Sequence, residues 1–88
     1  MAWILEYSDK ARKQLRKLDP TQQKIILSWM NKNISGSKNP RIHGKGLTSN
    51  HSGEWRYRIG DYRVLCDIQD DKLIVLAFHI EHRNKVYK

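Results

Sequence analysis

Hydrophobic and polar residues alternate along two short stretches in the second half of the chain, residues 55–59 and 62–68. Gly60 and Asp61 stand between them, and a Gly-Asp pair between alternating stretches signals a two-residue hairpin turn. The pattern therefore predicts an antiparallel β-hairpin that turns at these two residues.

The same alternation assigns each side chain of the hairpin to a face, because successive residues of a strand point to opposite sides of a sheet. In the register set by the turn, Arg58 lies directly opposite Arg63, and Arg56 shares their face. The other face carries Trp55, Tyr57, Ile59, Tyr62, Val64 and Cys66. Opposed like charges destabilise a sheet. Three clustered guanidinium groups therefore indicate a surface that holds an anion.

The first half of the chain has the pattern of one strand and two helices. Residues 3–7 are rich in aromatic and branched side chains, which favour a strand. Apolar residues then recur three or four positions apart within residues 9–18 and again within 25–34, as on one side of a helix.

Residues typical of helix ends mark the limits of both predicted helices. Ser8 and Asp19 are good N-cap residues, and Pro20 suits the first position of a helix. Gly36 suits the left-handed residue that often follows a helix. These signals predict two helices joined by a tight turn.

The last apolar stretch, residues 73–80, is apolar on both faces and predicts a strand inside the sheet. Asp70-Asp71 would turn the chain into it. The whole pattern predicts an α+β fold in a single domain over residues 1–88: an N-terminal strand, a helical hairpin and an antiparallel three-strand meander, forming a four-stranded sheet. The first strand could pair with either end of the meander.

Basic residues also gather outside the predicted hairpin. Residues 38–53 predict a loop rich in cations, and such loops can line a substrate groove. On the first helix the basic residues form either a solvated surface or one that faces phosphates. The candidates for RNA contact are Lys10, Lys13, Arg41, His43 and Lys45.

Composition narrows the class of partner. The 17 Lys and Arg residues against 9 Asp and Glu give a net charge of +8, which favours nucleic acid or an acidic protein as partner. The single cysteine, Cys66, excludes an internal disulfide and a cysteine-based zinc site. No apolar run reaches the about 18–20 residues of a membrane span, and the start lacks a signal-peptide pattern. A cytoplasmic location is expected.

The four histidines show no metal-protease spacing, and the chain has no phosphate-binding glycine-rich motif. Neither a metal nor another cofactor is expected. Metal-free RNA cleavage fits better, because RNA carries its own nucleophile, the 2′-hydroxyl. Arginine forks bind phosphate oxygens well, but they remain protonated and cannot readily move a proton. His82 and Tyr87 are the candidates for proton transfer.

The stretch from Trp55 to Val64, together with His82-Arg83 and Val86-Tyr87, resembles the RelE/ParE family of bacterial type II toxin–antitoxin toxins, in its RelE-like mRNA interferase branch. The resemblance implies a ribosome-dependent, metal-independent endoribonuclease. Such an enzyme cleaves mRNA in the ribosomal A site by 2′-hydroxyl attack and inhibits translation. The catalytic residues it implies are Arg56, Arg58, Arg63, His82, Arg83 and Tyr87.

The resemblance also implies partners. These are an acidic or amphipathic, RelB-like antitoxin protein, the ribosome with its mRNA, and operator DNA only through the antitoxin complex. No membrane partner is implied. Two alternatives remain open: a ParE-like toxin that inhibits DNA gyrase without cleaving anything, and a degenerate member that only binds its antitoxin and DNA.

Overall fold

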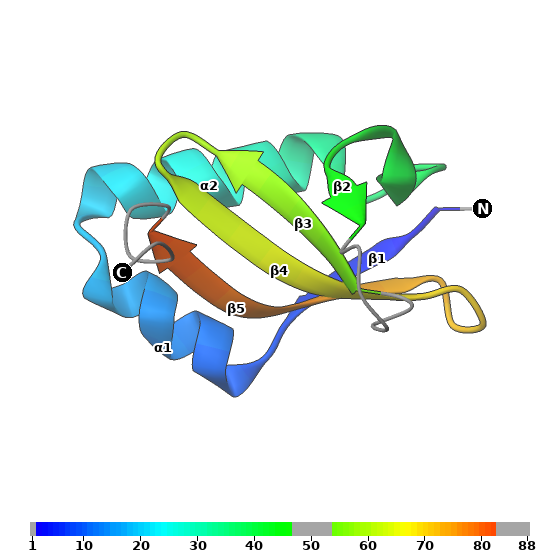
Figure 1. Cartoon of the computed structure of the whole chain (residues 1–88), viewed down its shortest axis with the longest axis horizontal. Coiled ribbons are helices and arrows are strands. Elements are labelled where there is room, and N and C mark those ends of the chain that lie inside the picture. Colours follow the sequence, from blue (N-terminus) through cyan, green and yellow to red (C-terminus); the bar gives the residue numbers. More distant parts are fainter. Residues whose placement is uncertain (1, 47–53, 83–88) are drawn as a thin grey trace.

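The computed structural model describes residues 2–46 and 54–82 (Figure 1). These residues form eight elements: β1 (Ile4–Tyr7), α1 (Asp9–Lys17), α2 (Pro20–Asn33), the 3-10 turn η1 (Pro40–Ile42), β2 (Lys45–Gly46), β3 (Glu54–Ile59), β4 (Tyr62–Gln69) and β5 (Ile74–His82). The predicted α+β fold and the order of its main elements are confirmed.

The sheet has five strands in the order β1-β5-β4-β3-β2. The prediction of four strands is wrong, because Lys45 and Gly46 pair with Arg56 and Trp55 and add a short strand at one edge. Two residues are too few to show an alternating pattern, so the sequence contains no signal for this strand. At the other edge β1 runs parallel to β5, which settles the pairing that the sequence left open.

The central hairpin has the predicted register. Arg58 pairs with Arg63 and Ile59 with Tyr62 across β3 and β4. Gly60 occupies the turn with φ of 58°, a left-handed conformation that glycine adopts without steric cost. The register puts the predicted arginine face and the predicted apolar face on opposite sides of the sheet.

The predicted helix ends are also confirmed. Ser8 Oγ accepts a hydrogen bond of 3.1 Å from the Ala11 amide, and Asp19 Oδ1 accepts one of 2.9 Å from the Gln22 amide. Gly36 follows α2 with φ of 76°. Caps of this kind satisfy amide groups that a helix leaves without partners at its start.

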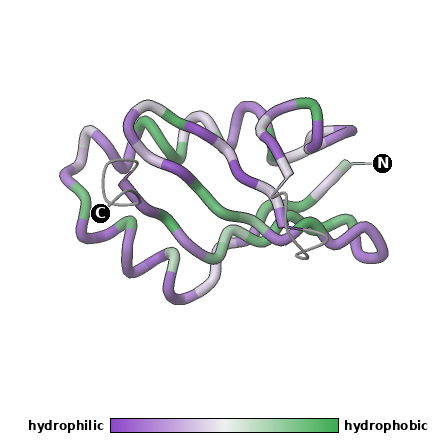
Figure 2. Tube along the Cα trace, in the orientation of Figure 1, coloured by the Kyte–Doolittle hydropathy of each residue, from purple (hydrophilic) through white to green (hydrophobic). Residues whose placement is uncertain are grey.

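The core lies between the helices and the apolar face of the sheet. Figure 1 shows α2 passing behind the sheet and α1 lying beside the C-terminal half of β5. The hydrophobic trace runs along the middle of β4, while most of α1 is hydrophilic (Figure 2). Buried core residues include Ala11, Leu15, Ile26, Met30, Tyr57, Val64, Cys66, Val75 and Ala77. Burial raises the pKa of the Cys66 thiol, so Cys66 behaves as a small core residue.

Within residues 2–46 and 54–82, neither helix combines the length and the apolar character needed to cross a lipid bilayer.

Candidate functional site

A pocket of about 460 Å³ lies beside β2 and the β3–β4 hairpin. It is lined by Trp29, His43, Gly44, Lys45, Arg56, Arg58 and Arg63. Three of the predicted catalytic arginines and two of the predicted RNA contacts therefore come together here. We call this site the arginine pocket.

The two strands of the hairpin supply the three arginines. These arginines differ in their exposure to solvent. Arg58 is exposed and Arg56 is half-buried, whereas the Arg63 residue is only 7% exposed. Arg63 lies between Arg58 on β3 and Glu81 on β5, which are its direct partners across the ladder. A carboxylate beside the two opposed arginines offsets part of their mutual repulsion.

Three contacts hold residues 40–44 against the sheet and so form one wall of the pocket. The Tyr57 hydroxyl donates a 2.7 Å hydrogen bond to the Pro40 carbonyl, and Trp55 Nε1 donates one of 2.6 Å to the His43 carbonyl. Arg41 adds a two-pronged ion pair to Asp70, at 2.9 and 2.8 Å. Trp55 and Tyr57 of β3 thus pack in or against the core and also hold this wall of the pocket in place.

Gly44 allows this wall to approach the sheet closely. Its φ is 79°, and an added Cβ would lie 2.7 Å from Trp55 Nε1 and 2.8 Å from Tyr57 Cδ1, and would also overlap the Arg56 carbonyl oxygen. Only glycine fits both this space and this backbone conformation.

The ring of His43 packs edge-on against the ring of Trp29, with 5.4 Å between their centroids. Trp29 also contacts Tyr57, at 5.5 Å. Trp29 is a pocket residue that the sequence pattern did not identify. Its place on the apolar side of α2 gave no signal for a second role.

Arg41 has a different position from the one expected of an RNA contact. Its guanidinium binds Asp70 and lies 5.8 Å from the centroid of the Trp55 ring. The hydrogen bond with Arg41 lowers the pKa of the Asp70 carboxyl, and the same bond raises the pKa of Arg41. In this structure Arg41 therefore fixes the wall of the pocket and is absent from the pocket lining.

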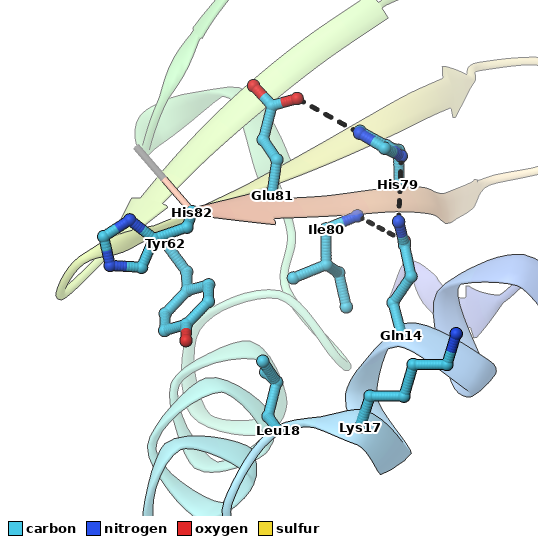
Figure 3. Close-up of a pocket in the computed structure, with 8 residues that line it drawn as sticks. All are labelled: Gln14, Lys17, Leu18, Tyr62, His79, Ile80, Glu81 and His82. Atoms are coloured by element: carbon cyan, nitrogen blue, oxygen red, sulfur yellow. Dashed lines mark hydrogen bonds and ion pairs between the residues drawn. The ribbon is translucent and has the colours of Figure 1, made fainter. Parts of the chain in front are cut away.

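His82 lies outside the arginine pocket. It pairs with Tyr62 across β4 and β5, and their rings meet edge-on with centroids 5.0 Å apart. Both residues line a second pocket of about 540 Å³ between α1, the end of β5 and Tyr62 (Figure 3). Its other lining residues are Gln14, Lys17, Leu18, His79, Ile80 and Glu81. Alternation along β5 puts His82 on the face opposite Glu81 and Arg63.

A chain of polar contacts leads from α1 to Glu81 (Figure 3). Gln14 Oε1 accepts a 2.7 Å hydrogen bond from the Ile80 amide, which leaves its Nε2 to donate to His79 Nδ1 at 3.2 Å. An amide nitrogen only donates. His79 therefore carries its proton on Nε2, which contacts Glu81 Oε1 at 3.1 Å.

This chain of contacts was not predicted from the sequence. A signal was available at Gln14, which is a polar residue within the apolar stripe formed by Ala11, Leu15 and Leu18. The stripe faces the open edge of β5, where Gln14 satisfies a strand amide that β1 is too short to reach.

Two further predicted RNA contacts are not part of the arginine pocket. Lys10 and Lys13 are exposed on α1, and neither lines that pocket. Arg83 and Tyr87 lie outside the described residues. In the part of the chain that the structure describes, no three His, Cys, Asp or Glu side chains lie close enough together to hold a metal ion.

The chain matches a known protein family over most of its length. Residues 5–87 match the family described as ParE toxin of the type II toxin–antitoxin system parDE. Toxin RelG of Mycobacterium tuberculosis is 27% identical over 88 residues, which cover 100% of this chain and 99% of the relative.

Solved structures agree with this family and with the fold. The toxin–antitoxin complex RelBE2 from Mycobacterium tuberculosis contains a chain that matches with a TM-score of 0.82 and 26% identity, over 94% of this chain and 93% of that one. The isolated RelE toxin of E. coli matches with a TM-score of 0.76 and 20% identity, over 92% and 84% of the two chains. At that identity the second likeness concerns the fold alone.

Proposed function

We propose a catalytic function for this chain, which belongs to the ParE toxin family and is a RelE-like toxin of a type II toxin–antitoxin system. The proposed reaction is the cleavage of mRNA in the ribosomal A site, by attack of the RNA's own 2′-hydroxyl and without a metal ion. The observation that carries this proposal is the convergence of Arg56, Arg58 and Arg63 on one pocket.

In the proposed reaction the arginine pocket binds the scissile phosphate. Negative charge grows on the phosphoryl oxygens as the 2′-oxygen attacks, and guanidinium groups already in place stabilise that charge without reorganising. The buried Arg63 is the fixed member of the set, and the exposed Arg58 is free to meet the substrate. Removing one such donor costs about 2.7–4 kcal/mol of transition-state stabilisation.

Proton transfer requires a group other than an arginine, because a guanidinium stays protonated at any working pH. The sequence-based hypothesis gives this role to His82 and Tyr87, with Arg83 as a further phosphate contact. In the structure His82 packs on Tyr62 in the second pocket. Because His82 lies outside the arginine pocket, this position favours a different proton carrier, one that lines the arginine pocket itself.

RNA on either side of the cut would contact other cations. Lys45 lines the pocket, and Lys10 and Lys13 are exposed on α1, where ribosomal RNA could meet them. The excess of positive charge over the whole chain supports such contacts and would speed the approach to an anionic target. Action on translating ribosomes implies a cytoplasmic site of action.

The proposed regulator is an acidic or amphipathic antitoxin of the RelB type. RelE-like toxins similar to this chain have been solved as complexes with RelB, from Pyrococcus horikoshii OT3 and from E. coli. A chain of net charge +8 would gain affinity and association rate from a partner of opposite charge. Operator DNA would be reached only through that complex.

Controlled expression in a bacterial host tests the proposal. Primer extension on a translated message should reveal new 5′ ends within codons, and a start-codon variant of the same message should remain intact. Co-expression of the neighbouring reading frame should restore growth, and its product should co-purify. Arrest of growth without message cleavage would contradict the proposed activity.

A second candidate function is inhibition of DNA gyrase, as in ParE toxins. The observation in its favour is that the matching family is described by the name ParE. A supercoiling assay with purified gyrase separates the two candidates, because an RNase that needs the ribosome leaves gyrase active.

A further inference from the structure

We propose that His43 is the general base of the arginine pocket, an inference that rests on the proposed function. Neither the comparisons nor the sequence-based hypothesis gives His43 a role in proton transfer. The pocket holds four charged residues, Lys45, Arg56, Arg58 and Arg63, and one imidazole. Lysine and arginine side chains in water titrate far above neutral pH, whereas an ordinary imidazole titrates near 6.5. His43 is the pocket-lining group suited to exchanging a proton near neutral pH.

The three described histidines are in different situations. The ring of His79 is engaged at both nitrogens, by Gln14 and by Glu81. His82 contacts Tyr62 and lines the second pocket. For His43, no hydrogen bond to either ring nitrogen is made within residues 2–46 and 54–82. Among the described residues, no group therefore competes with a substrate for the two ring nitrogens of His43.

The surroundings of His43 keep its ring in place without using its nitrogens. Its backbone carbonyl accepts the 2.6 Å hydrogen bond from Trp55 Nε1, and its ring meets the Trp29 ring in a T-shaped contact. Gly44, which directly follows, tolerates no side chain. A catalytic group needs this kind of support, because a small displacement from the productive geometry costs rate.

The proposed step exchanges one phosphorus–oxygen bond for another. The unprotonated nitrogen of His43 takes the proton of the 2′-hydroxyl as the bond from the 2′-oxygen to phosphorus forms. The bond from phosphorus to the 5′-oxygen breaks, and the leaving 5′-oxygen takes its proton from water. The products are a 2′,3′-cyclic phosphate, a 5′-hydroxyl end and a protonated His43, which returns its proton to solvent. No oxidant, reductant or metal takes part in this scheme.

Single-turnover cleavage on ribosomes programmed with a defined mRNA tests the inference. His43→Ala should cut about 10²–10⁴-fold more slowly than the parent, the usual effect of losing one acid–base group. His43→Gln keeps the size and polarity of the side chain and should be slow as well. Lys72→Ala, an exposed change of charge at the β4–β5 turn, should cut at the parent rate. Urea midpoints of the two His43 variants equal to that of the parent would show that the fold is retained.

Two further readouts separate a base from a merely structural residue. The parent rate should rise with pH as the imidazole loses its proton and then level off, and His43→Ala should lose that rise. Added imidazole should restore part of the rate to His43→Ala and none to Arg58→Ala, because imidazole replaces a proton carrier and cannot replace a guanidinium.

The outcomes distinguish this inference from the proposed function. If the parent cuts and His43→Ala cuts within about threefold of it, far from the usual acid–base effect, His43 is not the base. A large loss in His82→Ala under the same conditions would then assign the proton to His82. If the parent does not cut mRNA on the ribosome at all, the proposed function is wrong, and this inference with it.

Discussion

Arg58 and Arg63 lie directly opposite each other across the β3–β4 hairpin, one exposed to solvent and the other 7% exposed. Arg63 faces Glu81 on its second side, so two cations and one carboxylate form a row across three strands. Because Arg63 is buried and Arg58 is exposed, we expect the two arginines to contribute differently to the stability of the fold.

For Arg58→Ala we expect lost activity and an unchanged fold. The exposed guanidinium makes little contribution to the core, and its removal relieves a like-charge contact. Loss of one phosphate donor should slow cleavage about 10²–10³-fold. Single-turnover rates and urea midpoints, measured on the same preparation, test both parts of this expectation. A stable variant that cuts at the parent rate would exclude Arg58 from the site.

For Arg63→Ala we expect losses in both measurements. Arg63 is buried, and its removal takes away the cation that pairs with Glu81 across β4 and β5. The free energy of unfolding should fall by about 1–3 kcal/mol, in addition to a loss of activity like that of Arg58→Ala. Urea unfolding of the two variants side by side measures the difference. Equal midpoints would show that the burial of Arg63 has no energetic consequence.

Gly44→Ala has a matched control in Gly36→Ala. Both glycines have φ near the same value, 79° and 76°, but an added Cβ overlaps the sheet at position 44 and meets nothing within 4 Å at position 36. The left-handed strain of about 1–2 kcal/mol is common to both. Gly44→Ala should therefore destabilise the protein more than Gly36→Ala, and only Gly44→Ala should reduce cleavage. Equal effects on stability would mean that residues 43–46 can move away from the sheet at no cost.

Asp70→Asn tests the attachment of the pocket wall through its dependence on pH. The pKa of Asp70 is lower in the folded protein than the ordinary value near 3.9. Its ion pair with Arg41 therefore stabilises the fold above that ordinary value, and this contribution is lost as the pH falls through the folded-state pKa. Asp70→Asn should have a lower urea midpoint than the parent at pH 7, and the difference should disappear as the pH falls through the folded-state pKa of Asp70. A difference that persists in acid would point to a cause other than the ion pair.

Local rules were sufficient for the parts of the fold that depend on neighbouring residues. The Gly60-Asp61 turn fixed the hairpin register, and that register fixed the face of each arginine. Ser8 and Asp19 marked the helix starts because an N-cap needs only a side-chain oxygen and the next few amides. These features can be predicted without knowledge of the tertiary structure.

Features that depend on distant partners were beyond those rules. Arg41 binds Asp70, 29 positions away, and the sequence offered nothing to distinguish it from other loop cations. The face of His82 depends on the strand register at the end of β5, where it meets Tyr62. The short strand β2 exists only because β3 offers it an open edge. As a result, Arg41 and His82 lie outside the arginine pocket, whereas Lys45 of β2 lines it.

The most direct test of the central claim is cleavage by the purified chain on purified ribosomes. Ribosomes carrying a labelled mRNA with a chosen codon in an empty A site are mixed with the chain, and the product ends are mapped. The account predicts a single cut within that codon, a 2′,3′-cyclic phosphate on the upstream product, little cutting of the same mRNA without ribosomes, and a strongly reduced rate for Arg58→Ala. An intact mRNA in this assay, with gyrase inhibited by the same preparation, would contradict the account.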